Sequence, residues 1–201
     1  SVQEIRQTNV VMQQRDYSCG SASLATLFNY FLKEEVEERE IIKTLVELNE
    51  EKGTLEKVIE RRGFSLLDLK HFSESKGFVT KGFRLDFEDL VGLNLPAIVP
   101  IIPNGYKHFV VFKGVRNGRV FLADPSVGNI TEPIEKFKKD WYGFTNVALV
   151  IFPDDKNKDR FTDLTLTELD DIYIAGSDVD SLVHPVNRFN TPVLPYIPGE
   201  F

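Results

Sequence analysis

The chain has 201 residues, of which 42% are hydrophobic and 27% charged, which is typical of one globular domain with an extension. Its formal net charge is −7, from 31 acidic and 24 basic residues, so we expect no nucleic-acid partner. The single cysteine excludes an intramolecular disulfide and a zinc site built from several thiolates. The three histidines show no ligand spacing, so we expect no metal and no other cofactor. No apolar run approaches the roughly 18 residues of a membrane-spanning helix, and we expect none.

The first half of the chain carries a helical pattern. After a segment to about residue 11 without clear period, small and apolar residues recur at helical spacing. They predict a wide apolar face, and hence a buried central helix that begins at Cys19 and extends over residues 19–32. Further helices are expected over residues 41–48, 54–62 and 66–75.

The second half carries mainly strand patterns. We expect strands over residues 77–85, 97–102, 108–115, 119–123 and 146–152, and short helices over residues 86–93 and 133–141. Prolines on both sides of residues 97–102 predict restricted pairing for that strand. Helices followed by antiparallel strands define an α+β fold.

Composition changes again after Pro153. Residues 154–159 are charged, and residues 160–201 mix acidic residues, apolar residues and prolines without a repeat. We therefore predict a catalytic domain over residues 1–153 and an extension, not an independent domain, over residues 154–201. Bracing the sheet is the role we favour for the extension, ahead of covering a cleft or binding a partner.

Cys19 is the first candidate for chemistry. Its position at the predicted start of a helix favours the thiolate, because the helix dipole and unpaired backbone N–H groups stabilise negative charge there. A buried structural cysteine is the alternative, since cysteine is among the most often buried residue types. Position alone does not decide between the two.

Three further side chains supply the remaining parts of a nucleophilic site. His108 begins a strand and can present its imidazole at a sheet edge as a base, and Asp124 ends the next strand and can accept from that ring. Gln13 lies six residues before Cys19 and Gln14 five before, and either amide can donate to an oxyanion. Taken singly, these residues would more often be surface or turn residues.

Together the residues resemble a known family. Gln13, the block Cys19-Gly20-Ser21-Ala22, the block that begins at His108 and the block that contains Asp124 follow the order of the bacteriocin-processing, double-glycine leader peptidases, which belong to the papain-like cysteine proteases. The resemblance covers residues 10–152. It implies a papain-like α+β fold in which the nucleophile lies on the central helix, packed on a C-terminal antiparallel sheet. It also implies Cys19 as nucleophile, His108 as base, Asp124 as its orienting partner and Gln13, in preference to Gln14, as oxyanion donor.

The hairpin between the two strands must bring His108 and Asp124 to one face. If Asn117-Gly118 formed a regular two-residue turn, His108 would pair with Val127. Asp124 would then lie three positions from Val127 and on the opposite face of the sheet, where it cannot meet His108.

A three-residue loop over residues 116–118 resolves this conflict. It pairs His108 with Ser126 and puts Asp124 two positions away on the same face, across a diagonal of about 7–8 Å. We therefore predict a type I turn with Gly118 in the left-handed conformation and a G1 bulge. Another odd shift, such as a bulge inside a strand, would serve equally.

The resemblance also implies a reaction and a setting. Many family members are N-terminal domains of ABC exporters, but this chain has no Walker sequence and resembles the stand-alone members, some of which are linked to functional-amyloid secretion. The expected activity is cysteine endopeptidase cleavage after a Gly-Gly pair in a secreted or exported protein. The expected partners are that peptide or protein substrate and components of a secretion system.

Compartment and activity each have alternatives. The chain begins at Ser1 and shows no signal segment, so we expect a removed targeting segment and a periplasmic location, with the cytoplasm as the alternative. A leader-binding or secretion-adaptor domain that does not cleave is one alternative function. A papain-like amidase or transferase is the other.

Overall fold

A six-stranded antiparallel sheet with the order β1-β6-β2-β3-β4-β5 forms the centre of the molecule. The structure is a computed structural model, and it describes residues 2–143, 146–154 and 164–166. The strands are β1 (Thr80–Arg84), β2 (Ala97–Ile101), β3 (His108–Arg116), β4 (Arg119–Asp124), β5 (Gly128–Pro133) and β6 (Val147–Ile151).

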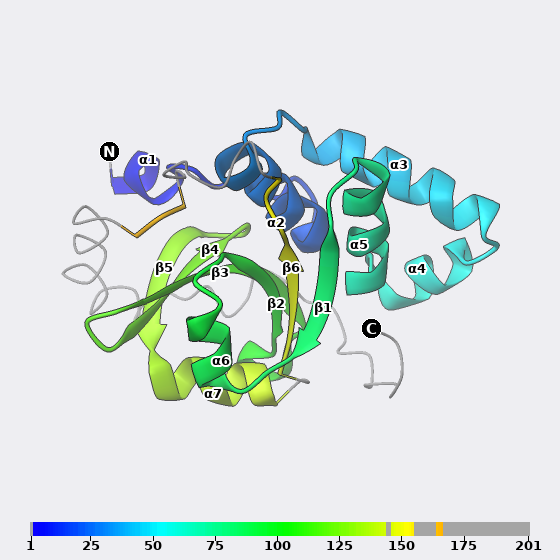
Figure 1. Cartoon of the computed structure of the whole chain (residues 1–201). Helices are drawn as coiled ribbons and strands as arrows, with labels where there is room; N and C mark the ends of the chain where they lie inside the picture. Colours follow the sequence, from blue (N-terminus) through cyan, green and yellow to red (C-terminus); the bar gives the residue numbers. More distant parts are fainter. Residues whose placement is uncertain (1, 144–145, 155–163, 167–201) are drawn as a thin grey trace.

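Most of the helices precede the strands in sequence, and two lie between them. They are α1 (Val2–Arg6), α2 (Cys19–Leu27), α3 (Glu38–Glu51), α4 (Leu55–Arg61), α5 (Leu66–Ser75), α6 (Phe87–Gly92) and α7 (Ile134–Tyr142). A π-helical turn, η1 (Phe28–Leu32), continues α2, and a 3-10 turn, η2 (Pro103–Gly105), precedes β3. Figure 1 shows α3, α4 and α5 grouped at one side of the molecule, and α2 contacts both α3 and β3. Helices packed with an antiparallel sheet confirm the expected α+β fold.

Two apolar cores lie on the two faces of the sheet. One joins the inner faces of α2, α3 and α5 to side chains such as Ile98, Phe109 and Val111. The other joins α6 and α7 to Val110 and Phe112 on the opposite face. The alternation of neighbouring β3 residues between the two cores is the period-2 pattern of a strand buried on both sides. The sheet is thereby fixed against α2, whose first residue is Cys19.

Most expected elements are present, with small differences in their bounds. The helix expected over residues 19–32 is formed by α2 together with η1, and α5 has the predicted limits. The sequence patterns did not predict α1 or β5. β5 is an edge strand with two half-buried positions, Ile130 and Thr131, and it lacks a clear apolar alternation. The strand between the prolines, β2, lies inside the sheet, pairing along its length with β3 and with β6 at Ile98 and Leu149.

The turn between β3 and β4 differs from the prediction. The prediction of a three-residue loop over residues 116–118 is wrong. Arg116 pairs with Arg119, so the turn contains only Asn117 and Gly118. Asn117 has φ 49° and Gly118 has φ 74°. Positive φ at both positions is the requirement of a type I′ turn, whose twist matches that of the strands and which Asn-Gly readily adopts.

The odd shift occurs inside β3 instead. The register changes between Phe112 and Gly114, so Lys113 is the extra residue of a β-bulge. When the register beyond the bulge is continued to the end of the strand, His108 lies opposite Ser126. The predicted alignment of His108 with Ser126 therefore results from a bulge inside a strand, which was the alternative to a three-residue loop.

Candidate active site

Cys19 is the first residue of α2 and is half-buried. Ser18 precedes it as the N-cap residue but makes no side-chain capping bond to the helix. A Cβ atom at Gly20 would lie 3.2 Å from the Phe109 ring and 3.3 Å from Leu69, so the glycine lets β3 approach the start of the helix closely. The sequence after Cys19 thus places the thiol against the beginning of β3.

His108 and Asp124 meet beside this helix end. The Nε2 atom of His108 donates to Oδ1 of Asp124 at 2.9 Å, and both residues are buried, each with an exposed fraction of 6%. The same carboxylate oxygen accepts from the backbone N–H of Ser126 at 2.8 Å and from its hydroxyl at 2.6 Å. Because Nε2 is held by Asp124, Nδ1 is the ring nitrogen left to serve the Cys19 thiol.

The charges of the three groups shift one another. Burial raises the pKa of Cys19. The hydrogen bond and charge of His108, together with the backbone N–H of Phe109, lower it by more than burial raises it, so the pKa lies below its ordinary value. Burial lowers the pKa of His108, yet the charge and hydrogen bond of Asp124, together with Cys19, raise it to about 10. Burial raises the pKa of Asp124, and His108 and Ser126 outweigh it and lower the pKa. The arrangement favours a thiolate–imidazolium pair.

The two glutamines occupy different surroundings. The backbone N–H of Gln13 donates to the carbonyl of Pro125 at 2.8 Å, which ties it to the residue after Asp124. Its side-chain amide donates to the carbonyl of Arg15 at 3.0 Å, and its Oε1 is buried without a hydrogen-bond partner. Gln14 is exposed, and its backbone N–H donates to the buried carboxylate of Glu38.

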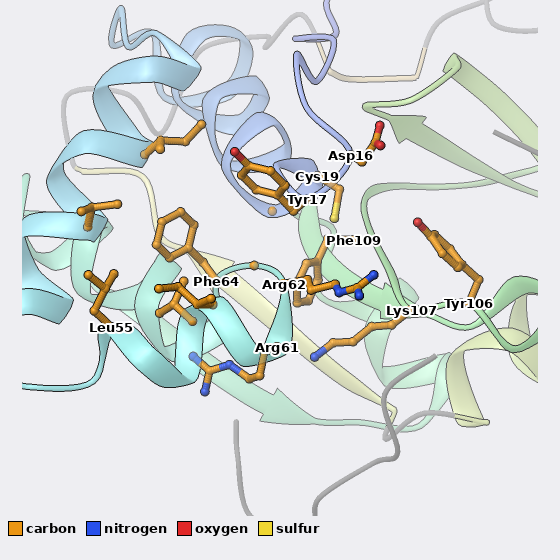
Figure 2. Close-up of a pocket in the computed structure, with 16 residues that line it drawn as sticks. Asp16, Tyr17, Cys19, Leu55, Arg61, Arg62, Phe64, Tyr106, Lys107 and Phe109 are labelled. Atoms are coloured by element: carbon orange, nitrogen blue, oxygen red, sulfur yellow. The ribbon is translucent and has the colours of Figure 1, made fainter. Parts of the chain in front are cut away.

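A pocket of about 580 Å³ opens beside Cys19. Figure 2 shows Cys19 at its edge, with Tyr17, Phe64 and Phe109 among the side chains that face it. Its apolar wall comes from α3, α4 and the segment after α4, and is completed by Ile42, Val46, Leu55, Val58 and Ile59. A network centred on buried Asp68, which accepts from Asn49, Ser65 and Arg61, holds α3, α4 and the start of α5 together behind that wall.

Ser126 and the pocket were not assigned a role from the sequence. The signal for Ser126 is present in Asp124-Pro125-Ser126, since an aspartate that accepts from the N–H two residues later forms an Asx turn. The pocket has no such local signal, because its lining comes from α2, α3, α4 and the start of β3. In the parts of the chain that the structure describes, no group of three or more His, Cys, Asp or Glu side chains is placed to hold a metal. None of the helices in those parts is both long and apolar enough to cross a membrane.

A cysteine at a helix start, a histidine at a strand start and an aspartate on the neighbouring strand form the kind of arrangement that papain-like cysteine peptidases use. Residues 7–156 match the model of the peptidase C39 family, and the chain belongs to that family.

Two curated relatives are named for a protease and for a processing function. The probable functional amyloid protease FapD of Pseudomonas aeruginosa is 33% identical over 143 residues, which cover 71% of this chain and 61% of that protein. The lactococcin-G-processing and transport ATP-binding protein LagD of Lactococcus lactis is 29% identical over 73% of this chain and 19% of its own length. The chain thus spans less than two thirds of each of these relatives.

Solved structures share the fold. The peptidase domain of Streptococcus ComA, a bifunctional ABC transporter, superposes with a TM-score of 0.58 at 24% identity, covering 74% of this chain and all of that domain. A double-glycine-motif protease from an AMS/PCAT transporter, solved with its leader peptide, gives a TM-score of 0.57 at 25% identity, covering 72% of this chain and 90% of that one.

Proposed function

We propose that this protein is a cysteine endopeptidase that cleaves after a Gly-Gly pair in a secreted or exported protein. The observation that carries the proposal is the contact chain from Cys19 through His108 to Asp124 at the edge of the apolar pocket. The similarity to a double-glycine-motif protease bound to its leader peptide supports the choice of bond.

The proposed reaction runs through a thioester. The Cys19 thiolate attacks the scissile carbonyl carbon, and the resulting oxyanion accepts hydrogen bonds from the Cys19 backbone N–H and the Gln13 amide. The intermediate collapses as the C–N bond breaks, and protonated His108 gives its proton to the leaving amine. Neutral His108 then takes a proton from water, which attacks the thioester and releases the acid and the Cys19 sulfur.

Asp124 acts on His108 and not on the substrate. Its carboxylate fixes the ring through Nε2 and stabilises the imidazolium, while Ser126 fixes the carboxylate. The half-buried thiol is reached from the pocket, whose apolar wall would take up substrate side chains on one side of the scissile bond.

The proposal places catalysis in residues 1–153 and a bracing role in residues 154–201. Leu164 belongs to the core shared by α2 and α3, with an exposed fraction of 2%, and Leu166 lies against Gly114. We further propose that the substrate is met in the periplasm, together with a secretion system, because relatives are named for functional amyloid and for processing with transport.

The test compares peptides and one variant. Wild-type protein should cleave a synthetic peptide with a central Gly-Gly pair, and replacement of either glycine by alanine should lower kcat/KM. Cys19→Ala should abolish cleavage while circular dichroism shows the same fold. Cleavage by Cys19→Ala would refute the nucleophile assignment. Binding of the peptide without cleavage by the wild-type protein would favour the leader-binding adaptor, and transfer of the acyl group to an added amine in place of water would favour the transferase.

A further inference from the structure

Glu38 is a buried carboxylate to which the proposed mechanism gives no role. It is the first residue of α3 and has an exposed fraction of 3%. The backbone N–H of Gln14 donates to both of its oxygens, at 3.3 Å each. Among the described residues, this N–H is the one hydrogen-bond donor to the carboxylate. Because a buried charge without a hydrogen-bond partner is costly, the contact keeps the Gln14 backbone against the start of α3.

Gln14 belongs to the segment that joins the proposed oxyanion donor to the nucleophile. This segment covers residues 13–18, and we call it the Gln13 loop. It begins at Gln13, ends at the residue before Cys19 and forms neither helix nor strand. The regular hydrogen bonds of a helix or a sheet therefore do not set its conformation, and contacts with other parts of the fold must do so.

Two of these contacts come from the sheet side and from the start of α2. The backbone N–H of Gln13 donates to the carbonyl of Pro125 at 2.8 Å. The hydroxyl of Ser18, a buried residue, accepts from the N–H of Arg15 at 3.2 Å and donates to the carbonyl of Arg15 at 3.0 Å. That carbonyl also accepts from the Gln13 side-chain amide at 3.0 Å. The sheet side thus holds the backbone of Gln13, and the start of α2 holds the group that its side chain contacts.

Glu38 supplies the third contact, on the other side of the Gln13 Cα atom. The Gln13 N–H belongs to the peptide group that precedes this atom, and the Gln14 N–H belongs to the peptide group that follows it. Each peptide group is a rigid plane, so a hydrogen bond to its N–H restricts the whole plane. Pro125 and Glu38 together restrict both planes. They thereby restrict the two backbone dihedral angles that set the direction of the Gln13 side chain.

We propose that Glu38 is a positioning residue that holds Gln13 in the conformation that serves the oxyanion. Without the carboxylate, the peptide group after Gln13 can rotate, and the side-chain amide is no longer directed at one place. Donors stabilise an oxyanion best when they are placed in advance, so a small displacement is costly in the transition state. Glu38 does not line the pocket, and substrate binding should not depend on it. This inference rests on the proposed function, because it takes Gln13 to be the oxyanion donor.

The experiment separates kcat from KM in two matched variants. Glu38→Met fills the same buried space without an oxygen acceptor, and Glu38→Gln keeps one oxygen for the Gln14 N–H. With a Gly-Gly peptide as substrate, Glu38→Met should lower kcat by about 10- to 100-fold and leave KM almost unchanged. Glu38→Gln should recover most of the lost kcat. Glu37→Ala is the control, because Glu37 is exposed, makes no side-chain capping bond and should keep the wild-type kcat.

A double-mutant cycle shows whether Glu38 acts through Gln13. In a Gln13→Ala protein the donor is gone, so adding Glu38→Met should lower kcat no further. Alkylation of Cys19 by iodoacetamide is the second readout, because it forms no oxyanion and reports a general disturbance of the site. Glu38→Met and the wild-type protein should be alkylated at the same rate and with the same pH dependence, and should give the same circular dichroism spectrum.

Three results would overturn the inference: an unchanged kcat in Glu38→Met, losses that add in the double variant, or a loss that extends to the alkylation of Cys19. Failure of the proposed function is seen separately, with an activated ester of a peptide ending in Gly-Gly. Acylation of Cys19 by this ester also forms an oxyanion but requires no cleavage of a peptide bond.

The ester therefore tests Glu38 even if the wild-type protein cleaves no peptide. If acylation falls in Glu38→Met and is restored in Glu38→Gln, the positioning role stands and the peptidase activity does not. Acylation at one rate in all three proteins, or in none of them, would overturn the positioning role as well.

Discussion

At the scale of single side chains, the reactivity of Cys19 depends on charges that stabilise one another. A thiolate alone would be disfavoured by burial, and an imidazolium alone would be disfavoured in the same way. The contact between Cys19 and His108, together with the contact between His108 and Asp124, outweighs the effect of burial on both pKa values. In the proposed mechanism, Cys19 and His108 are therefore already charged before the substrate binds.

The pH dependence of kcat/KM should follow from these shifts. Activity should rise as Cys19 ionises, at a pH below the ordinary thiol value of about 8.5. It should fall as His108 loses its proton near pH 10, because the imidazolium is the acid for the leaving group. Asp124→Asn removes the charge that raises the pKa of His108, so its descending limb should move to lower pH. A descending limb at the same pH in both proteins would contradict the assigned role of Asp124.

Gln13 should act on the transition state more than on the bound substrate. One N–H of the Gln13 side-chain amide donates to the carbonyl of Arg15, and the second N–H of the same amide is the proposed oxyanion donor. Gln13→Ala should lower kcat by about 100-fold or more, with a small change in KM. Gln14→Ala is the matched control, because Gln14 is exposed and is held through its backbone N–H. A larger loss of kcat in Gln14→Ala would reverse the assignment of the two glutamines.

At the scale of elements, the bulge in β3 decides whether His108 and Asp124 share a face. Gly114, which follows the bulge, has φ 143°, and a Cβ there would lie 3.3 Å from a side-chain carbon of Leu166. Gly114→Ala should lower the free energy of unfolding by about 1–3 kcal/mol, measured by chemical denaturation, because an L-residue is strained in that backbone conformation. Gly82→Ala in β1 is the control, since no atom lies within 4 Å of the added Cβ and no positive φ is found there. Equal losses in the two variants would show that the bulge conformation carries no such strain.

The register between β3 and β4 was predicted only in part from the sequence. A regular two-residue hairpin would separate His108 from Asp124, so the sequence predicts an odd register shift between β3 and β4, and the structure contains that shift. The predicted location of the shift, in the turn, was wrong. Asn117-Gly118 forms a two-residue turn, for which this pair of residues is well suited. The bulge at Lys113 could not be located from the sequence, because no local residue pattern there distinguishes it from regular strand. β5 was also not predicted, because its sequence lacks a clear strand pattern and the strand is recognised only by its pairing with β4.

At the scale of the whole molecule, the site lies where the helical and the strand-rich halves meet. Cys19 comes from the helical half, His108 and Asp124 from the sheet, and the pocket from both. The order of the blocks along the sequence predicts that Cys19, His108 and Asp124 form one site, and the structure brings these three side chains together. The pocket required the three-dimensional arrangement, because its lining residues are drawn from segments far apart in sequence.

The described part of the extension should contribute to global stability. Leu164→Ala should lower the free energy of unfolding by about 2–5 kcal/mol, because the side chain is buried in the core beside α2. Leu67→Ala on α5 is the control, because that leucine is 44% exposed and the change should stay within about 0.5 kcal/mol. A neutral Leu164→Ala would argue against bracing by the extension.

The central claim is that Cys19 forms a thioester with the N-terminal part of a cleaved peptide. The most direct measurement is mass spectrometry of the protein after acid quenching during turnover of an activated ester of a peptide ending in Gly-Gly. We predict an acyl adduct on the fragment that contains Cys19, which is released by hydroxylamine and is absent from Cys19→Ala. Turnover that depends on the folded protein but leaves no adduct on Cys19, and continues in Cys19→Ala, would contradict the account.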